Sequence, residues 1–503
     1  MKYFLILDVG TTNIKAHAFT NDGKLVESFE QRSKPIYPEP GWIEQEPMFI
    51  IDTIHKLIEK TIAKLGKPLG LALTNQRSTT ILWDKKSGEP LYNMITWQDT
   101  RTIDIIENLS KKFILKFGRG LGKTTKKLSR LIPSIKHTKK GAYIITLANI
   151  GFGTAHSSMH IRWMMENVED VKKAINKKQA VFGNIDSWVT WNLTGKHVTD
   201  LTNASATGIF DPFYTKWSNN VLKIVEIPQE IMPAFITNDT QIGIAKDYDI
   251  PYLTQIADQQ ASLYMAGVKK GDISITNGTG AFIDMNVGEI PAPGDIGIYP
   301  LVALSTKNKT IFLLEGAVNA TGSAIDWLID IGFIDNYSEI SKAFKESSDE
   351  TNITFIPPLS GLNSPYLRPD IKAAIFDITR DTSKNDFVKS LIQGIAMRCS
   401  EVVIALEKVS NINVKKVIAD GGVSQNDEYL QLISDFSNKQ VLRPKNLNGT
   451  AYGTFMLAKS VYEKKDVIKS WVPPEIEKKF KPLHKHEKFK NQWNRYIKNL
   501  LEN

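Results

Sequence analysis

One local pattern opens each half of the chain. An apolar run over residues 3–8 predicts a buried strand that ends at Asp8-Val9-Gly10-Thr11-Thr12, and alternation over residues 14–19 predicts its hairpin partner. Residues 271–286 repeat the order of strand, Gly/Thr turn and strand around Asn277-Gly278-Thr279-Gly280. Strand and helix patterns alternate after both turns, which is typical of α/β domains. The sequence therefore predicts an α/β protein made of two similar domains.

The remaining periodic segments fit the same plan. Helices are predicted at residues 48–65, 156–176, 181–194, 322–331 and from Asp427 onward, and strands at residues 69–74, 81–84, 307–314 and 417–420. We place the domain boundary near residues 248–255, where Asp249-Ile250-Pro251 interrupts the regular pattern, giving domains of residues 1–250 and 251–503. No low-complexity linker marks this boundary, so the two domains are expected to pack together and hinge.

The composition fits a globular enzyme. The chain has 503 residues, of which 42% are apolar and 23% are charged, and both values are ordinary for globular proteins. The single cysteine, Cys399, excludes an intramolecular disulfide and fits a reducing compartment. The N-terminus has no signal-peptide pattern, and no apolar stretch reaches the ~18 residues that a membrane-spanning helix needs. We expect a cytoplasmic enzyme.

The net charge of +9 is concentrated in one segment. Residues 111–140, called the basic segment below, contain eleven Lys/Arg and no Asp/Glu, which leaves a net charge of −2 in the rest of the chain. Three interpretations of the basic segment are open. It forms a solvated surface excursion, it contacts an anionic membrane surface or nucleic acid, or it makes a contact within an oligomer. Residues 111–117 interleave lysines with Phe, Ile and Leu, which favours a lipid surface. No nucleic-acid partner is expected.

The two Gly/Thr turns contain the residue types that bind phosphates. Glycine lets backbone N–H groups approach phosphate oxygens, and threonine adds a hydroxyl. Asp8, at the end of its strand, has a carboxylate suited to Mg²⁺. Neither turn matches the P-loop or the dinucleotide-binding pattern. Asp258, in Ile256-Ala257-Asp258-Gln259-Gln260, is a candidate base, and the combination indicates phosphoryl transfer from a nucleotide to an alcohol.

A series of ordered motifs, from about residue 3 to residue 460, resembles the FGGY carbohydrate kinases, and most of all their glycerol-phosphorylating branch. The matching strings are Asp8-Val9-Gly10-Thr11-Thr12, Gly41-Trp42-Ile43-Glu44-Gln45, Asn75-Gln76-Arg77, Trp97-Gln98-Asp99-Thr100-Arg101, Trp191-Asn192-Leu193-Thr194-Gly195, Asp258-Gln259-Gln260, Asn277-Gly278-Thr279-Gly280, Ser364-Pro365-Tyr366-Leu367-Arg368-Pro369-Asp370 and Asp420-Gly421-Gly422. So many motifs in one order make chance agreement negligible.

This resemblance implies an α/β fold of two ribonuclease-H-like domains, of the actin/hexokinase type, around a central cleft. A small polyol or sugar would bind mostly to residues 1–250, and ATP with Mg²⁺ mostly to residues 251–503. Asp258 would be the general base, and Asp8 would lie near Mg²⁺. The residues placed around ATP and its transferring phosphate are Thr11, Thr12, Lys15, Gly278, Thr279, Gly322, Gly422 and Asn426. The resemblance also implies a homo-oligomer, either a dimer or a tetramer.

The substrate pocket departs from the family pattern at two positions. Ser78 stands where these kinases have a glutamate that accepts hydrogen bonds from the polyol, and Ala155 stands where they have a tyrosine. The other positions around the substrate are retained, namely Arg77, Trp97, Asp258, Gln259 and Phe282. With Ser78 as a shorter, neutral contact, the implied pocket is wider and less negative. Such a change matters because hydrogen bonds to hydroxyls discriminate strongly between substrates.

The first functional expectation is ATP-dependent phosphorylation of glycerol to sn-glycerol 3-phosphate. The second is a kinase for another sugar or polyol, such as a ketopentose, a tetritol or a sugar acid. The third is a non-catalytic nucleotide-binding sensor that uses the basic segment to bind a partner. The presence of Asp8, Asp258 and both phosphate turns argues against the third.

Overall fold

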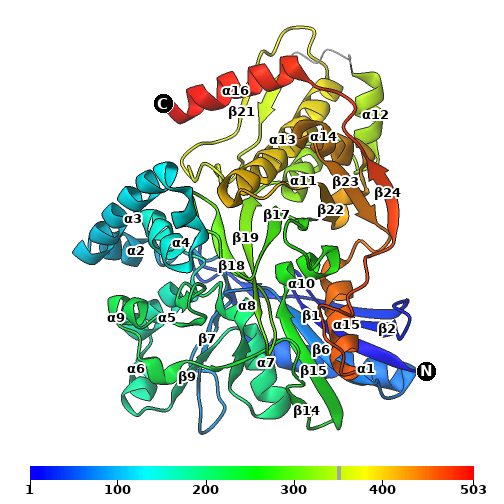
Figure 1. Cartoon of the computed structure of the whole chain (residues 1–503). Helices are drawn as coiled ribbons and strands as arrows, with labels where there is room; N and C mark the ends of the chain where they lie inside the picture. Colours follow the sequence, from blue (N-terminus) through cyan, green and yellow to red (C-terminus); the bar gives the residue numbers. More distant parts are fainter. Residues whose placement is uncertain (348–352, 503) are drawn as a thin grey trace.

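Each half of the molecule is organised around one large mixed sheet (Figure 1). The computed structural model describes residues 1–347 and 353–502. The first sheet has the order β14-β15-β6-β1-β2-β3. Its strands are β1 (Tyr3–Val9), β2 (Asn13–Thr20), β3 (Leu25–Arg32), β6 (Gly70–Asn75), β14 (Gly243–Ala245) and β15 (Ile250–Ala257). β1 pairs antiparallel with β2 and parallel with β6, and β6 pairs parallel with β15.

The second sheet repeats this plan in the order β18-β19-β17-β16-β22-β23-β24. Its strands are β16 (Ile273–Asn277), β17 (Ala281–Gly288), β18 (Tyr299–Ser305), β19 (Thr310–Val318), β22 (Lys416–Asp420), β23 (Gln440–Pro444) and β24 (Ile476–Phe480). β16 pairs antiparallel with β17 and parallel with β22, as β1 does with β2 and β6. The prediction of two α/β units built on repeated strand–turn–strand openings is confirmed.

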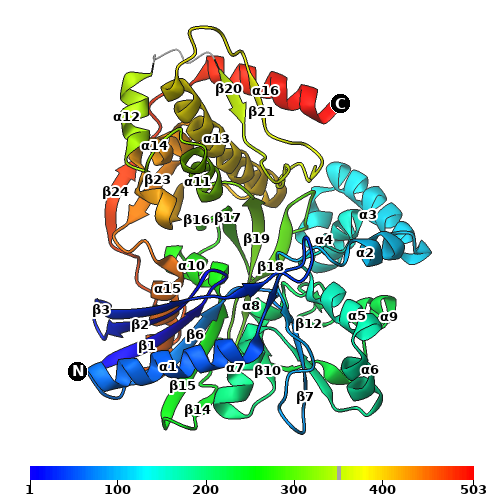
Figure 2. The same ribbon diagram turned by 180° about the vertical axis from the view of Figure 1, so that it is seen from behind.

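Helices cover both faces of each sheet, and one of them crosses between the halves. α1 (Pro47–Leu65) and α7 (Ile185–Thr194) pack on one face of the first sheet. The opposite face is covered by α15 (Gly449–Tyr462), where Phe455 packs against Phe4 and Phe19 (Figures 1 and 2). α10 (Asp258–Ala266) lies between the two sheets and contacts α15. In the second half, α13 (Lys384–Ser410) packs along β17 and β19.

The other described elements are shorter or lie at the periphery. They are β4 (Pro35–Ile36), β5 (Glu44–Gln45), β7 (Ile81–Asp84), β8 (Met94–Ile95), β9 (Ala180–Gly183), β10 (Val198–Asp200), β11 (Phe210–Asp211), β12 (Lys216–Trp217), β13 (Ala234–Ile236), β20 (Thr354–Ile356), β21 (Ala374–Phe376), α5 (Ser157–Asn167), α6 (Glu169–Asn176), α8 (Leu201–Ala204), α9 (Asn219–Val225), η3 (Gln229–Ile231), α11 (Gly322–Asp330), α12 (Glu339–Glu346), η4 (Gly422–Gln425), α14 (Asp427–Ser437) and α16 (Glu487–Glu502).

Two predicted helices differ from the structure, and the expected domain boundary falls within a strand. The helix predicted over residues 181–194 is wrong at its start, because Ala180–Gly183 is the strand β9, paired antiparallel with β7. A short, fully buried apolar run has no periodicity that separates a strand from a helix. The helix predicted over residues 156–176 is two helices, because Val168 is extended between α5 and α6. The boundary expected near residues 248–255 falls within β15, and the chain leaves the first sheet only after Ala257.

The basic segment forms a helical projection from the first half, on the left of Figure 1. It follows α2 (Ile103–Ser110) and comprises α3 (Phe113–Leu131), η1 (Pro133–His137) and the start of α4 (Lys139–Thr146), after which η2 (Leu147–Asn149) ends the projection. Lys126 Nζ lies 2.6 Å from Asp295 Oδ1, on the loop before β18. The projection therefore touches both halves. No helix in the described parts of the chain combines the length and apolarity required to cross a bilayer.

Candidate active site

Asp258 is the first residue of α10, directly after β15 ends, and α10 lies between the two sheets (Figure 1). About 25% of its side-chain surface is accessible, which leaves the carboxylate open to a ligand. Burial raises the pKa of Asp258, and the nearby Arg77 guanidinium opposes that rise. Its Oδ1 accepts a hydrogen bond from the Gln259 N–H at 2.8 Å. The structure thus presents a largely desolvated carboxylate with a fixed orientation.

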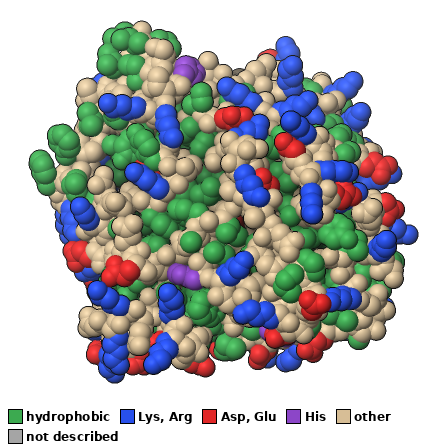
Figure 3. All heavy atoms as spheres, turned by 60° about the horizontal axis from the view of Figure 1, so that its bottom comes forward, with side chains coloured by type: hydrophobic (Ala, Val, Ile, Leu, Met, Phe, Trp, Pro, Cys, Tyr) green, Lys and Arg blue, Asp and Glu red, His purple; other side chains and the backbone are tan. Residues whose placement is uncertain are grey.

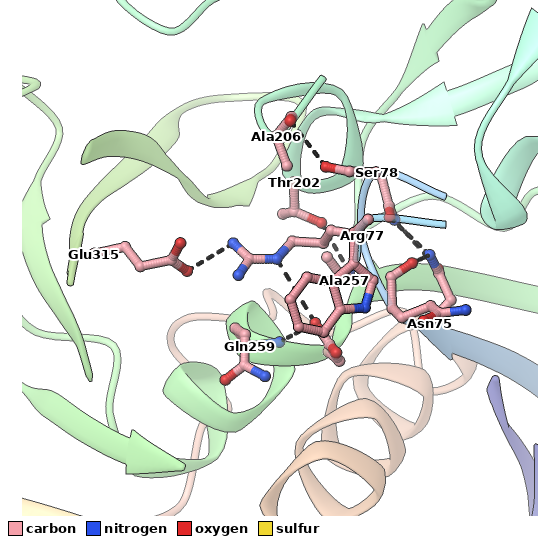
Figure 4. A network of polar contacts seen from close by, with 12 residues as sticks. Asn75, Arg77, Ser78, Thr202, Ala206, Ala257, Gln259 and Glu315 are labelled. Atoms are coloured by element: carbon pink, nitrogen blue, oxygen red, sulfur yellow. Dashed lines mark hydrogen bonds and ion pairs between the residues drawn. The ribbon is translucent and has the colours of Figure 1, made fainter. Parts of the chain in front are cut away.

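Arg77 connects the two halves across this junction (Figure 4). It follows β6, and its Nε lies 3.7 Å from Asp258 Oδ1. Its Nη1 lies 2.7 Å from Glu315 Oε2, on β19 of the second sheet. The guanidinium also stacks over Phe282, 5.5 Å from the ring centroid. Because only 9% of the Arg77 side chain is exposed, its charge depends on these partners for stabilisation.

Asp284 adds a second-domain carboxyl group that the sequence interpretation missed. It lies two residues after Phe282 on β17, so both side chains share a face of the strand. Asp284 pairs across the sheet with Glu315. It is fully buried, and its carboxyl interacts with the Glu315 carboxyl and the Arg77 guanidinium. Burial and the Glu315 charge hold the pKa of Asp284 well above its usual range. An acidic residue within an apolar strand was the available sequence signal.

Asp8, near the end of β1, lies close enough to Asp258 for the two charges to interact. Burial and Asp258 raise the pKa of Asp8 to about 7, and Lys15 opposes the rise. Lys15 lies opposite Asp8 in the hairpin and forms a 3.4 Å ion pair with Glu30. A divalent cation would relieve the repulsion between the two carboxylates, and carboxylate oxygens are ligands that Mg²⁺ accepts. The residues therefore fit Mg²⁺.

This metal site would need ligands from outside the protein. Among the described residues, no group of three or more His, Cys, Asp or Glu side chains is placed to hold a metal. Mg²⁺ commonly takes only one or two carboxylates from a protein and completes its shell with water and substrate phosphates. Asp8 thus suits a metal that arrives with a polyphosphate.

Thr11 belongs to a polar chain that links the first turn to the substrate side. Trp97 Nε1–H donates to Thr11 Oγ1 at 3.0 Å, and Thr11 Oγ1–H donates to Gln76 Oε1 at 2.5 Å. Gln76 in turn donates through Nε2 to Gln45 Oε1 at 3.0 Å. Thr12, the next residue, is exposed and remains accessible to a ligand. Trp97 is therefore held by the same turn that was predicted to approach phosphate.

Ser78 has a local structural role in addition to its predicted place in the pocket. Its hydroxyl donates to the Ala206 carbonyl at 2.9 Å, so its one proton is not available to a substrate in this arrangement (Figure 4). Its φ of 63° lies in the left-handed region, which non-glycine residues adopt mainly at tight or functional positions. Ala155 lies partly buried just before α5. Neither residue provides the acidic or phenolic group that it replaces.

A cavity of about 940 Å³ lies on the second domain, between the β16–β17 turn and the starts of α11 and α14. Its lining includes residues predicted to surround ATP, namely Gly278, Thr279, Gly322, Gly422 and Asn426. The Gly322 N–H donates to the Gly278 carbonyl at 3.1 Å, and a Cβ on Gly322 would lie 2.5 Å from that oxygen. Asn426 Oδ1 caps α14 by accepting from the Tyr429 N–H at 2.7 Å. The cavity has the size of a cofactor site.

Two sites of different chemistry therefore meet at the junction. One has an accessible carboxylate, a buried guanidinium and two further acidic groups, which suit a ligand rich in hydroxyls. The other is a large cavity edged by glycine turns, which suit a phosphorylated ligand. The β16–β17 turn connects them, because it lines the cavity and leads into the strand that holds Phe282 and Asp284.

Two family models match the chain, and both describe the FGGY family of carbohydrate kinases. The model of the N-terminal domain matches residues 3–128 and 123–254, and the model of the C-terminal domain matches residues 273–461. Together they account for more than half of the chain.

Similar proteins match over nearly the whole length. An uncharacterized sugar kinase of Archaeoglobus fulgidus is 33% identical over 455 residues, covering 90% of both chains. Glycerol kinase 2 of Thermotoga maritima is 32% identical over an alignment of 520 positions, covering 100% of this chain and 99% of the relative. Among solved structures, Plasmodium falciparum glycerol kinase with ADP has a TM-score of 0.88 at 27% identity, covering 100% of this chain and 98% of that chain. The expected two-domain, actin/hexokinase-like fold is confirmed.

Proposed function

The chain belongs to the FGGY family of carbohydrate kinases, and from this premise we propose that it transfers the γ-phosphoryl group of ATP to a hydroxyl of a small polyol. Membership makes it an ATP-dependent kinase that uses Mg²⁺ with the nucleotide. Glycerol is the first substrate we propose, with sn-glycerol 3-phosphate as the product. Relatives that are named glycerol kinase, at 32% and 33% identity, support this choice.

The observation that carries the proposal is the position of Asp258. Its carboxylate is accessible, lies at the start of α10 and is oriented by Arg77 and the Gln259 N–H. A base in this position accepts the proton of the attacking hydroxyl as the oxygen–phosphorus bond forms and the ADP oxygen leaves. Phosphoryl transfer depends mainly on alignment and charge neutralisation, so a fixed carboxylate beside a buried guanidinium suits the reaction.

The nucleotide is proposed to lie in the second-domain cavity, with its phosphates directed toward the β1–β2 turn. Gly278, Thr279 and Gly422 would approach the phosphates, while Thr12 and Lys15 would approach them from the first domain. Mg²⁺, when bound with the nucleotide, neutralises phosphate charge and would be held by Asp8. The pairing of Lys15 with Glu30 is half-exposed, so a phosphate can replace that partner.

A second candidate substrate is a larger polyol or sugar, and the second-domain carboxyls favour it. The Ser78 hydroxyl donates its proton to the Ala206 carbonyl. Ala155 stands where the related kinases have a tyrosine, and its smaller side chain leaves space for a larger substrate. Glu315 and Asp284 offer acceptors on the opposite side of Arg77. A ligand with hydroxyls reaching both domains would contact Glu315, whose side chain is 11% exposed next to the buried Asp284.

A panel of polyols, sugars and sugar acids tests these proposals. Purified protein is incubated with ATP, Mg²⁺ and one acceptor at a time, and ADP release is measured. Turnover with glycerol at the highest kcat/KM supports the first substrate. Turnover with a tetritol, ketopentose or sugar acid but not with glycerol would reject glycerol and support the second. ATP binding without turnover on any acceptor would favour a non-catalytic sensor and reject both.

A further inference from the structure

One face of α3 exposes large apolar side chains to solvent. Phe113 is 81% exposed, Phe117 is 63% exposed and Leu131 is 82% exposed. Leu121 and Leu128 are also exposed. Their spacing places all five on one side of the helix, because residues three, four or seven apart share a face. We call these five residues the apolar strip. Scattered exposed apolar residues are common, but a continuous strip marks an interaction site.

The basic residues of α3 lie beside the apolar strip rather than within it. Lys116, Lys123, Lys127 and Arg130 are exposed, and none of them forms an ion pair within residues 1–347 and 353–502. The helix has no acidic residue, since the whole basic segment lacks Asp and Glu. The nearest acidic side chains in sequence, on α2, precede the segment. α3 is therefore amphipathic with its apolar face toward solvent and a cationic face next to it.

The third face of α3 fixes this orientation. Leu115 and Gly122 are its buried residues. A Cβ on Gly122 would lie 2.1 Å from the Ala148 backbone nitrogen, so the helix is in close backbone contact with η2. Lys126 is held by Asp295, and Arg119 Nε donates to the Ile150 carbonyl at 2.9 Å. Because these contacts position the opposite side of the helix, α3 cannot roll to bury its apolar strip against its own protein.

We propose that α3 binds the surface of membranes that contain anionic lipids. An apolar face flanked by cations is the pattern of a helix that lies in the bilayer interface, with its apolar side chains among the acyl chains and its lysines at the headgroups. A nucleic-acid surface would use the cations but would leave the apolar strip in water. The apolar strip thus fits the acyl chains and the neighbouring cations fit the anionic headgroups, so a lipid surface matches both features.

This location is compatible with an open active site, and the inference does not depend on the catalysed reaction. α3 projects from the side of the molecule, and hydrophobic and basic side chains are also seen at the left edge of Figure 3, on the side where α2 and α3 lie in Figure 1. α10, which begins at Asp258, lies instead between the two sheets (Figure 1). A protein docked through α3 would be held at the membrane surface while small molecules still reach the junction of its halves.

Vesicle co-sedimentation of the full chain tests the proposal. Vesicles of phosphatidylcholine alone are compared with vesicles in which about one third of the lipid is phosphatidylserine. We expect the protein to bind the anionic vesicles and to be released by salt. The triple variant Phe113→Ser/Phe117→Ser/Leu131→Ser should bind at least about ten-fold more weakly, because it loses most of the inserted apolar surface. A matched control, Tyr37→Ser/Val472→Ser/Leu483→Ser, removes side chains that are 67%, 65% and 69% exposed elsewhere and should bind normally.

The charge contribution is tested separately. Lys116→Glu/Lys123→Glu/Lys127→Glu should lose binding to the anionic vesicles, whereas Lys177→Glu/Lys415→Glu/Lys485→Glu, at exposed lysines elsewhere, should change it little. Unchanged melting temperatures establish that every variant is folded. Failure of the unmodified protein to bind anionic vesicles would overturn the proposal. Sedimentation velocity without lipid adds a further check: self-association that the apolar triple variant abolishes would assign the strip to a second copy of the chain instead.

Discussion

Asp258 combines accessibility with a raised pKa, and both properties bear on its proposed task. Its carboxyl must be ionised to accept a proton, so activity should fall as the pH is lowered. Because burial raises the pKa of Asp258, the acid limb of the kcat/KM profile should lie above the ordinary aspartate value of ~4. Asp258→Asn should lower kcat by about 10²-fold or more. Calorimetry should still detect ATP binding, and an Asn variant with full activity would refute the assigned base.

The same shift predicts the sign of a stability effect. The folded-state pKa of Asp258 lies above the unfolded value, so the folded protein holds the proton more tightly. Ionising Asp258 therefore destabilises the folded state, and this cost appears as the pH rises from the unfolded pKa through the folded one. The Asn variant does not ionise. Its melting temperature relative to the wild type should thus increase as the pH rises through that window, and a difference independent of pH would contradict the prediction.

Asp284 tests whether the second domain contributes to substrate recognition. Asp284→Leu removes a fully buried carboxyl whose ionisation is opposed by burial and by the Glu315 charge, so the free energy of unfolding should rise by about 1–3 kcal/mol. If Asp284 binds a substrate hydroxyl, the KM of the preferred acceptor should rise about ten-fold while the KM of ATP stays constant. Ser274→Ala, on the neighbouring strand, is the control. Greater stability with an unchanged acceptor KM would make Asp284 purely structural.

The sequence predicted the site residues that lie at strand ends. It did not predict those whose positions depend on the register between neighbouring strands. Asp258 directly follows β15 and Arg77 lies two residues after β6, so their approach to one site follows from the parallel pairing of these strands. The proximity of Asp284 and Glu315 depends on the register of β17 against β19, which spacing alone does not contain. The hydrogen bond from the Ser78 hydroxyl to the Ala206 carbonyl likewise depends on a contact between segments that are far apart in the sequence.

At the scale of the elements, the turn after β22 contains two adjacent glycines with different expected roles. We expect Gly421 to be required for folding and Gly422 for nucleotide binding. Gly421 has a φ of 85°, and a Cβ there would lie 2.2 Å from the Asn277 carbonyl oxygen. Gly421→Ala should therefore destabilise the protein by about 2 kcal/mol or more. A Cβ on Gly422 meets nothing within 4 Å, and Gly422 lines the nucleotide cavity.

The expected outcome for Gly422→Ala is the reverse of that for Gly421→Ala. Its melting temperature should stay near that of the wild type, because the added methyl meets no protein atom. Its affinity for ATP should fall about ten-fold if that open space holds the phosphates. Thermal denaturation and calorimetric titration of both variants give the two readouts. Equal ATP affinity in Gly422→Ala and the wild type would remove this turn from the proposed nucleotide site.

The elements that sequence patterns predicted well have strong periodicity or end at glycine turns, as α1 and the β16–β17 hairpin do. β9 was missed because four buried residues carry no period. The placement of α15 on the first sheet was not predictable either, because its 449–462 segment packs against strands more than 400 positions earlier in the chain.

At the scale of the whole molecule, α15 and Arg77 join the two halves in different ways. α15 packs Phe455 against Phe4 and Phe19, so we expect this helix to move together with the first sheet. The Arg77–Glu315 ion pair joins the end of β6 to β19 across the proposed substrate site, so we expect it to break if the two halves move apart. We therefore expect the α15 contact to be the fixed side of a hinge and the Arg77–Glu315 ion pair to act as a latch. Closure of this kind would exclude water from a transferring phosphate.

The latch predicts a shift in the conformational equilibrium. Glu315→Gln removes the charge opposite Arg77, and a loss of about 1.4 kcal/mol would change the ratio of closed to open molecules about ten-fold. Small-angle X-ray scattering of the ligand-free variant should show a larger radius of gyration than the wild type. Asp295→Asn weakens the Lys126 ion pair, which also joins the halves but is about one-third exposed, so its effect should be small. Equal expansion in both variants would mean that the halves are held by charge in general and not by a latch in the substrate site.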